Sequence, residues 1–166
     1  MVNDAFSNTP TSQKPQPMAR ILIADDDELI AELASEALID SGHACGWVTS
    51  AEAAWDCVHR KRPDVLLLDQ AMPGESGLSL LRRLRISPLL YDLPVVMFTT
   101  ISGEEDEAQA IYAGAQDFLT KPFDPFMLVS RINRLLKRRG DRPRHVDLVH
   151  AVLAQPVTTQ PLRRTI

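Results

Sequence analysis

The stretch Asp64-Val65-Leu66-Leu67-Leu68-Asp69-Gln70-Ala71-Met72-Pro73-Gly74 decides the fold of this chain. Its four consecutive apolar residues, bounded by Pro63 and by the Pro73-Gly74 pair, are typical of a strand buried on both faces of a parallel sheet. Asp69 would then lie at the carboxyl edge of that sheet, where open α/β sheets bind their ligands. This stretch alone leaves a second interpretation open, in which Asp69 caps the next helix or begins a turn.

The composition favours one soluble domain of ordinary size. The chain has 166 residues, enough to bury a core without disulfide bonds. Its two cysteines, Cys45 and Cys57, lack a CxxC spacing and clustered histidines, so we expect reduced thiols in a cytoplasmic protein and no zinc site. No run approaches the roughly 18 apolar residues of a membrane span. The net charge of −4 argues against a general nucleic-acid binder.

The rest of the chain alternates between short apolar runs and stretches with helical periodicity. We expect strands over residues 21–24, 44–48, 65–69, 94–98 and 116–120. We expect helices over residues 28–40, 50–61, 76–87, 104–113 and 125–139. The connections are too long for hairpins, which implies parallel strands with right-handed crossovers. The fold class is therefore α/β, a doubly wound five-stranded parallel sheet with helices on both faces, and no GxGxxG or GxxxxGK[ST] motif indicates a nucleotide site.

Polar side chains follow four of the five expected strands. Asp25 and Asp26 follow the first, Asp69 ends the third, Thr99 follows the fourth and Lys121 follows the fifth. Each has an ordinary explanation by itself, such as a cap, a β-favouring residue or a solvated charge. In a parallel sheet all of them meet at one edge, where three carboxylates repel one another unless a cation offsets their charge. Oxygen ligands without Cys or His favour a hard ion, so we expect Mg²⁺.

These residues resemble the signature of the response-regulator receiver domains of two-component phosphorelays, and the likeness extends over residues 20–139. The matching positions are Asp25-Asp26, Asp69, Met72-Pro73, Gly77, Thr99 and Lys121-Pro122-Phe123. The resemblance implies the flavodoxin-like strand order 2-1-3-4-5. It also implies a phosphorylation-switched signalling module, chemotaxis-receiver-like, that is no enzyme beyond assisting its own Mg²⁺-dependent phosphorylation and dephosphorylation.

The resemblance implies a role for each site residue. Asp69 would accept a phosphoryl group from the phosphohistidine of a histidine kinase or phosphotransfer protein. Asp25, Asp26, Asp69 and the backbone carbonyl of Ala71 would hold Mg²⁺. Lys121, whose bond to Pro122 is cis in the family, would pair with a phosphoryl oxygen. The hydroxyl group of Thr99 would bind another phosphoryl oxygen.

The same likeness implies a switch. Thr99 would move toward the phosphoryl group, and an aromatic residue on the fifth strand, here Phe118, would fill the space left behind. The family often has Tyr at that position and usually has Ala or Gly where this chain has Thr100. Ala71 has no polar side chain to position a hydrolytic water, which indicates a phosphate that is not short-lived. The target would bind on the face formed by the fourth helix, fifth strand and fifth helix, with a phosphorylation-dependent homodimer as a further expectation.

The segments outside the receiver region suggest tails. Residues 1–19 are polar and rich in Pro, so we expect a disordered leader. Residues 140–166 are too few for a DNA-binding effector, so we expect a stand-alone receiver with no DNA-binding domain and no membrane partner. Val146, Val149 and Leu153 lie at helical spacing, which predicts a short helix over residues 145–154.

Two other functions stay open at this stage. Asp25-Asp26-Asp27 after a strand also fits the nucleophile motif of haloacid dehalogenase-type phosphohydrolases, with Asp25 as nucleophile. Leu29 departs from that motif, which wants Thr or Val there. The third function is a receiver-fold interaction domain that is never phosphorylated.

Overall fold

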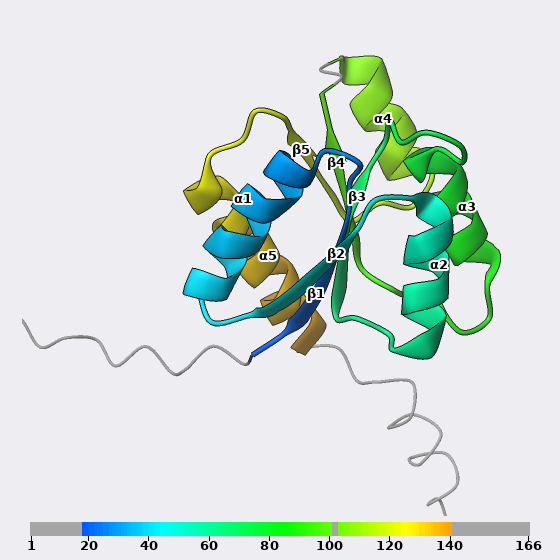
Figure 1. The fold of residues 1–166 in the computed structure, drawn as a ribbon. Coiled ribbons are helices and arrows are strands. Elements are labelled where there is room, and N and C mark those ends of the chain that lie inside the picture. Colours follow the sequence, from blue (N-terminus) through cyan, green and yellow to red (C-terminus); the bar gives the residue numbers. More distant parts are fainter. Residues whose placement is uncertain (1–17, 101–102, 141–166) are drawn as a thin grey trace, which may run out of the picture.

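The computed structural model describes residues 18–100 and 103–140. It shows one parallel sheet with helices on both faces (Figure 1). The elements are β1 (Arg20–Ala24), α1 (Glu28–Asp40), β2 (Ala44–Val48), α2 (Ala51–Arg60), β3 (Val65–Asp69), α3 (Gly77–Ile86), β4 (Val95–Thr99), α4 (Glu104–Tyr112), β5 (Asp117–Thr120) and α5 (Pro125–Gly140). Most of the expected leader and the expected helix over residues 145–154 lie outside the described residues.

The strand order is β2-β1-β3-β4-β5, and every neighbouring pair is parallel. α1 and α5 cover one face of the sheet, while α2, α3 and α4 lie on the other (Figure 1). This confirms the predicted doubly wound, flavodoxin-like fold. In the described part of the chain, no helix is long and apolar enough to span a membrane.

The central strand β3 joins two hydrophobic cores. Leu66 and Leu68 belong to the core beneath α2 and α3, whereas Val65 and Leu67 belong to the core beneath α1 and α5. All five residues of β3 are buried, because helices cover both faces of the sheet. The apolar run of residues 65–68 therefore places Asp69 at the end of a fully buried strand.

Side-chain caps begin three of the helices. Asp27 accepts hydrogen bonds from the backbone N–H groups of Leu29 and Ile30, Ser50 caps α2 and Ser76 caps α3. Such caps satisfy backbone donors that have no partner within the helix. Since Ser76 caps the helix after β3, the interpretation of Asp69 as a helix cap is wrong.

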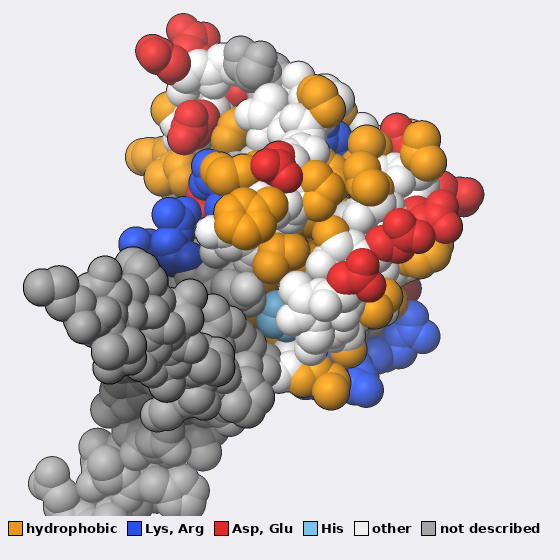
Figure 2. Space-filling view, turned by 90° about the vertical axis from the view of Figure 1, so that its left-hand side faces the viewer, with side chains coloured by type: hydrophobic (Ala, Val, Ile, Leu, Met, Phe, Trp, Pro, Cys, Tyr) orange, Lys and Arg blue, Asp and Glu red, His pale blue; other side chains and the backbone are white. Residues whose placement is uncertain are grey.

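The buried side of α5 agrees with the spacing of its apolar residues except at one position. That spacing predicts Phe126, Val129, Ile132 and Leu136 on the buried side. Ile132 is fully buried and Val129 and Leu136 pack against the core, whereas Phe126 is 76% exposed. Figure 2 looks at the face that α1 and α5 cover and shows hydrophobic side chains lying among charged ones there. Phe126 lies in the first turn of α5, where the spacing of apolar residues alone did not predict its exposure.

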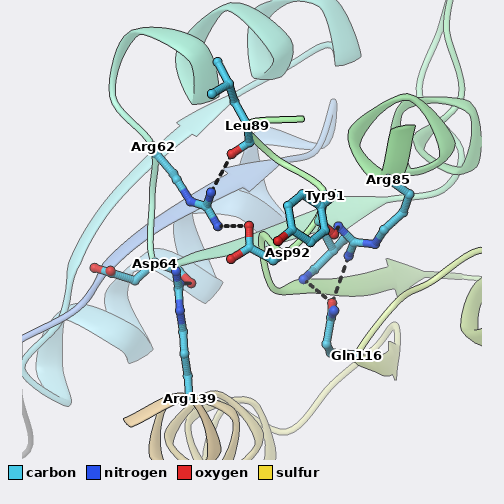
Figure 3. Close-up of polar contacts among 9 residues, drawn as sticks. Arg62, Asp64, Arg85, Leu89, Tyr91, Asp92, Gln116 and Arg139 are labelled. Atoms are coloured by element: carbon cyan, nitrogen blue, oxygen red, sulfur yellow. Dashed lines mark hydrogen bonds and ion pairs between the residues drawn. The ribbon is translucent and has the colours of Figure 1, made fainter. Parts of the chain in front are cut away.

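The helical spacing of α3 predicts that Arg82, Arg83 and Arg85 face water, but Arg85 is only partly exposed. Its guanidinium group donates to the carbonyls of Gly114 (2.9 Å) and Tyr91 (3.1 Å) and to Gln116 Oε1 (3.0 Å). Figure 3 shows Arg85 beside Tyr91 and Gln116, together with Arg62, which donates to the Leu89 carbonyl and pairs with Asp92. Two arginines thus fasten the loop between α3 and β4.

Candidate functional site

The predicted site residues lie together at the carboxyl edge of the sheet. Asp25 follows β1, Asp69 ends β3, Thr99 ends β4 and Lys121 follows β5. A cavity of about 430 Å³ opens there. Its lining residues are Asp25, Asp26, Asp27, Ile30, Asp69, Ala71, Thr100, Lys121 and Pro122.

Lys121 connects two of the carboxylates. Its ammonium nitrogen forms an ion pair with Asp25 and lies 3.3 Å from Asp69 Oδ1. The lysine side chain is only 7% exposed, and its nitrogen also lies 5.0 Å from the centre of the Phe98 ring. The Lys121–Pro122 peptide bond is cis, as the resemblance implies. A buried lysine between two buried carboxylates offsets part of their repulsion.

Asp25, Asp26 and Asp69 form a cluster of oxygen donors. One carboxylate oxygen from each residue lies within 4.8 Å of the others, with Asp26 exposed and the other two buried. Asp25 Oδ1 accepts a hydrogen bond from the backbone N–H of Asp27 (3.0 Å), whereas the buried Oδ2, although ion-paired with Lys121, has no hydrogen-bond partner. Oxygen donors without Cys or His suit a hard cation that keeps several waters. The residues therefore fit Mg²⁺.

Asp69 carries a carboxyl group with a raised pKa. Burial is the main cause, because it penalises the charged form. The Lys121 ammonium group opposes the rise, and the negative charge of Asp25 adds to it. The site without a metal ion therefore holds more negative charge than its surroundings stabilise.

The two predicted switch residues lie on neighbouring strands. Thr99 is fully buried, and its carbonyl accepts a hydrogen bond from the backbone N–H of Lys121 (2.7 Å). Phe118 is 8% exposed and pairs with Met97 in the register of β4 and β5. Its ring already belongs to the core on the α2 and α3 side. Thr100 is exposed and lines the cavity, so it lies where it can restrict access.

Gly77 brings the start of α3 against the end of β3. A Cβ atom at this position would lie 1.9 Å from the carbonyl oxygen of Asp69, so no side chain fits. The backbone N–H of Gly77 donates to the carbonyl of Gln70 (3.1 Å). The loop that carries Ala71 is therefore folded tightly beside Asp69.

Three residues near the site were not among the predicted site residues. Asp27 and Ile30 line the cavity from the start of α1, and Phe98 lies beneath the Lys121 ammonium group. Asp27 had a signal in the run of three aspartates after the first strand. Ile30 and Phe98 had none, because both look like ordinary core residues in the sequence.

Comparisons with known proteins agree with this geometry. The family model described as the response regulator receiver domain matches residues 21–133. The chain is similar to the phosphate regulon transcriptional regulatory protein PhoB of Pseudomonas aeruginosa, with 35% identity over 83% of this chain and 61% of the relative. A solved structure of a putative response regulator from Chloroflexus aurantiacus has 35% identity and a TM-score of 0.70, covering 73% of this chain and 99% of that one.

The prediction of a stand-alone regulator with no DNA-binding domain is wrong as an inference from length. The chain is 32% identical, over 88% of its residues, to the DNA-binding dual master transcriptional regulator RpaA of Synechocystis. It spans only 61% of that relative and 61% of the PhoB relative. A receiver domain has its own core, so the same domain occurs within longer regulators, and the number of residues after α5 does not exclude an effector.

Proposed function

The chain belongs to the response regulator receiver domain family of two-component systems, and on this basis we propose that Asp69 accepts a phosphoryl group and thereby alters binding to a partner protein. One observation carries the proposal. Asp69 ends the fully buried strand β3 beside a cavity, within 3.3 Å of Lys121 and next to two further carboxylates. Such a constellation serves phosphoryl transfer, which depends mainly on positioning and electrostatic stabilisation.

Asp69 would be the nucleophile. A carboxylate oxygen attacks the phosphorus of a phosphohistidine on a histidine kinase or phosphotransfer protein, and the bond between phosphorus and the ring nitrogen breaks. The acyl phosphate that forms remains on β3. The two cores that pack against the faces of β3 hold the backbone of Asp69 in place at the edge of the sheet.

Asp25, Asp26, Asp69 and the backbone carbonyl of Ala71 would hold Mg²⁺. When bound, the ion would offset the charge of the carboxylates and of the transferring phosphoryl oxygens. Lys121 would bind one phosphoryl oxygen with its ammonium group, exchanging its contact with Asp69 for one with the phosphate. The hydroxyl group of Thr99 would donate to another oxygen, and a shift of Thr99 against Phe118 would carry the signal to the surface.

The domain is a signalling module of its family rather than a classical enzyme. A phosphohydrolase with Asp25 as nucleophile is less consistent with the geometry, because the Asp25 carboxylate is fully buried and already binds Lys121 and the Asp27 N–H group. The family assignment also favours Asp69. We propose a cytoplasmic location, where Cys45 and Cys57 stay reduced, as both are free thiols in the structure.

Beryllofluoride tests the proposal, since it mimics a phosphoryl group bound to a carboxylate. The full chain should bind it in a Mg²⁺-dependent manner, followed by NMR chemical shifts of the Thr99 and Lys121 amides. Asp69→Asn should abolish these changes, and Asp64→Asn, at a half-exposed carboxylate away from the cavity, should retain them. A lack of binding at saturating beryllofluoride would favour the interaction domain that is never phosphorylated.

A further inference from the structure

The loop of residues 70–76, which joins β3 to α3, carries the Ala71 carbonyl. Both ends of this loop are fixed by backbone hydrogen bonds. The N–H of Gln70 donates to the Phe98 carbonyl (3.2 Å), and the N–H of Gly77 donates to the Gln70 carbonyl (3.1 Å). These bonds set where the loop leaves the sheet and where α3 begins. The outer part of the loop, Gly74 and Glu75, lies between these two bonds.

Side chains of α2 and α3 hold that outer part from the side away from the cavity. The Glu75 side chain is only 15% exposed. It accepts a hydrogen bond from the Ser79 hydroxyl group (3.1 Å) and forms an ion pair with Arg83. The Arg83 guanidinium group lies over the Trp55 ring, 4.0 Å from its centre. Trp55 in turn packs against the core beneath α2 and α3. A chain of contacts therefore runs from the loop to the rigid interior.

Glu52 of α2 approaches the same part of the loop. Gly74 has a positive φ of +82°, and a Cβ atom there would lie 3.4 Å from Glu52 Oε1. The pKa of Glu52 lies below its ordinary value, chiefly because its carboxylate accepts from its own backbone N–H, with smaller contributions that include the Glu75 backbone and Arg83. We call Glu52, Trp55, Glu75 and Arg83 the outer cluster.

We propose that Glu75, Arg83 and Trp55 are positioning residues for the Mg²⁺ site, because they hold the loop that carries Ala71, which lines the cavity beside the three carboxylates. This inference rests on the proposed function. None of the three residues lines the cavity, so each acts through the loop and not by touching the ion. Residues that orient the ligands of a metal ion commonly change its affinity by about 10–100-fold.

The sign of the effect separates positioning from simple electrostatics. Arg83 carries a positive charge, and its removal alone would make Mg²⁺ binding tighter. Loss of the stack on Trp55 and of the pair with Glu75 would instead loosen the loop and weaken binding. A weaker affinity after Arg83 is replaced is therefore specific to the positioning role.

Isothermal titration of the full chain with Mg²⁺ tests this inference. Arg83→Met should raise the Kd about tenfold. Arg83→Lys keeps the charge but not the planar stack, so its Kd should lie between those of the wild type and Arg83→Met. Arg82→Met is the matched control, because Arg82 has the same charge on the same helix but is exposed. We expect its Kd to equal the wild-type value. Circular dichroism confirms that each variant is folded.

Four outcomes have separate meanings. Wild-type affinity in Arg83→Met, or tighter binding, would overturn the positioning role. An equal loss in Arg82→Met would overturn it too, since the effect would then not depend on the contacts of Arg83 with Glu75 and Trp55. No Mg²⁺ binding by the wild-type chain would contradict the proposed function itself. At saturating Mg²⁺, phosphorylation of Arg83→Met should reach the wild-type rate, and a lower limiting rate would contradict the inference.

Discussion

Asp69 is held between opposing influences, since burial and Asp25 disfavour its charge and Lys121 favours it. The net result is a raised pKa, so the folded state binds a proton at Asp69 more readily than the unfolded chain. The stabilisation associated with this proton is complete below the ordinary carboxyl pKa and is lost as the pH rises through the raised value. At neutral pH and without Mg²⁺, the wild-type domain therefore carries the cost of a buried charge.

Asp69→Asn removes that charge and should raise the Tm in EDTA at pH 7 by about 2–5 °C. Lys121 keeps its ion pair with Asp25 in this variant, so no buried ammonium group is left alone. The gap between variant and wild type should narrow as the pH falls through the pKa of Asp69. Thermal melts from pH 7 to pH 4.5 measure it. A lower Tm for the variant at pH 7 would contradict the account of the acid cluster.

Gly77 is a second position where one residue controls the site. Gly77→Ala places a Cβ atom where only 1.9 Å separates it from the Asp69 carbonyl oxygen, so the loop and α3 must move apart. We expect a loss of about 2–4 kcal/mol in the free energy of unfolding, measured by urea denaturation. Gly46→Ala is the control, because nothing lies within 4 Å of the added atom. Equal stability of both variants would refute the close approach.

Among the helices and strands, the alternation of apolar runs and helical stretches was sufficient to predict a parallel five-stranded sheet and nearly every boundary, whereas the strand order followed from the family resemblance. β2 and α1 begin and end at the expected residues, because both are bounded by clear turn and cap residues. The exposure of Phe126 and the contacts of Arg85 were not predictable. Both depend on partners distant in the sequence, such as Gly114 and Gln116 for Arg85.

In the candidate site, too, the positions of the residues could be predicted from the sequence but their side-chain contacts could not. Asp25, Asp69, Thr99 and Lys121 were predictable because each follows an apolar run, and parallel strands bring such positions together. The double ion pair of Lys121 was not, since it depends on side-chain directions across three strands. Neither were the contacts of the outer cluster, which joins α2 to the loop before α3.

Arg85 provides a test at this scale. Arg85→Met removes a half-buried guanidinium group that donates to three acceptors around the α3–β4 loop and the end of α4 (Figure 3). We expect a loss of about 1–3 kcal/mol in the free energy of unfolding, since two backbone carbonyls and Gln116 lose a charged donor. Arg82→Met should change stability by less than about 0.5 kcal/mol. Urea denaturation of both variants measures the two changes. An unchanged free energy of unfolding in Arg85→Met would show that the contacts of Arg85 add no stability.

In the whole molecule, the two ends of the parallel strands differ in their charged residues. Buried carboxylates lie at the carboxyl edge of the sheet. At the opposite edge, Arg62, Arg85 and Arg139 donate hydrogen bonds to backbone carbonyls, Arg139 to that of Asp64 (2.8 Å). A stable core under both faces lets the domain tolerate the unfavourable charge. Since the chain spans 61% of its PhoB relative, this division applies to the receiver domain, whatever it is joined to.

Mg²⁺ should therefore stabilise the whole domain. A metal concentration of 100 times the Kd should add about 2.7 kcal/mol to the free energy of unfolding. Asp26→Asn removes one exposed ligand without opening a core cavity and should reduce this gain. Asp64→Asn, remote from the cavity, should retain it. Chemical denaturation with and without Mg²⁺ measures the difference, and an equal gain in all three proteins would place the binding elsewhere.

Mapping the modified residue tests whether Asp69 is the phosphoacceptor. The full chain is incubated with acetyl phosphate and Mg²⁺, the acyl phosphate is reduced with borohydride, and the peptides are sequenced by mass spectrometry. We expect a single Mg²⁺-dependent modification at Asp69 that is absent in Asp69→Asn. A modification at Asp25, or none at Asp69 under conditions in which Mg²⁺ is bound, would contradict it.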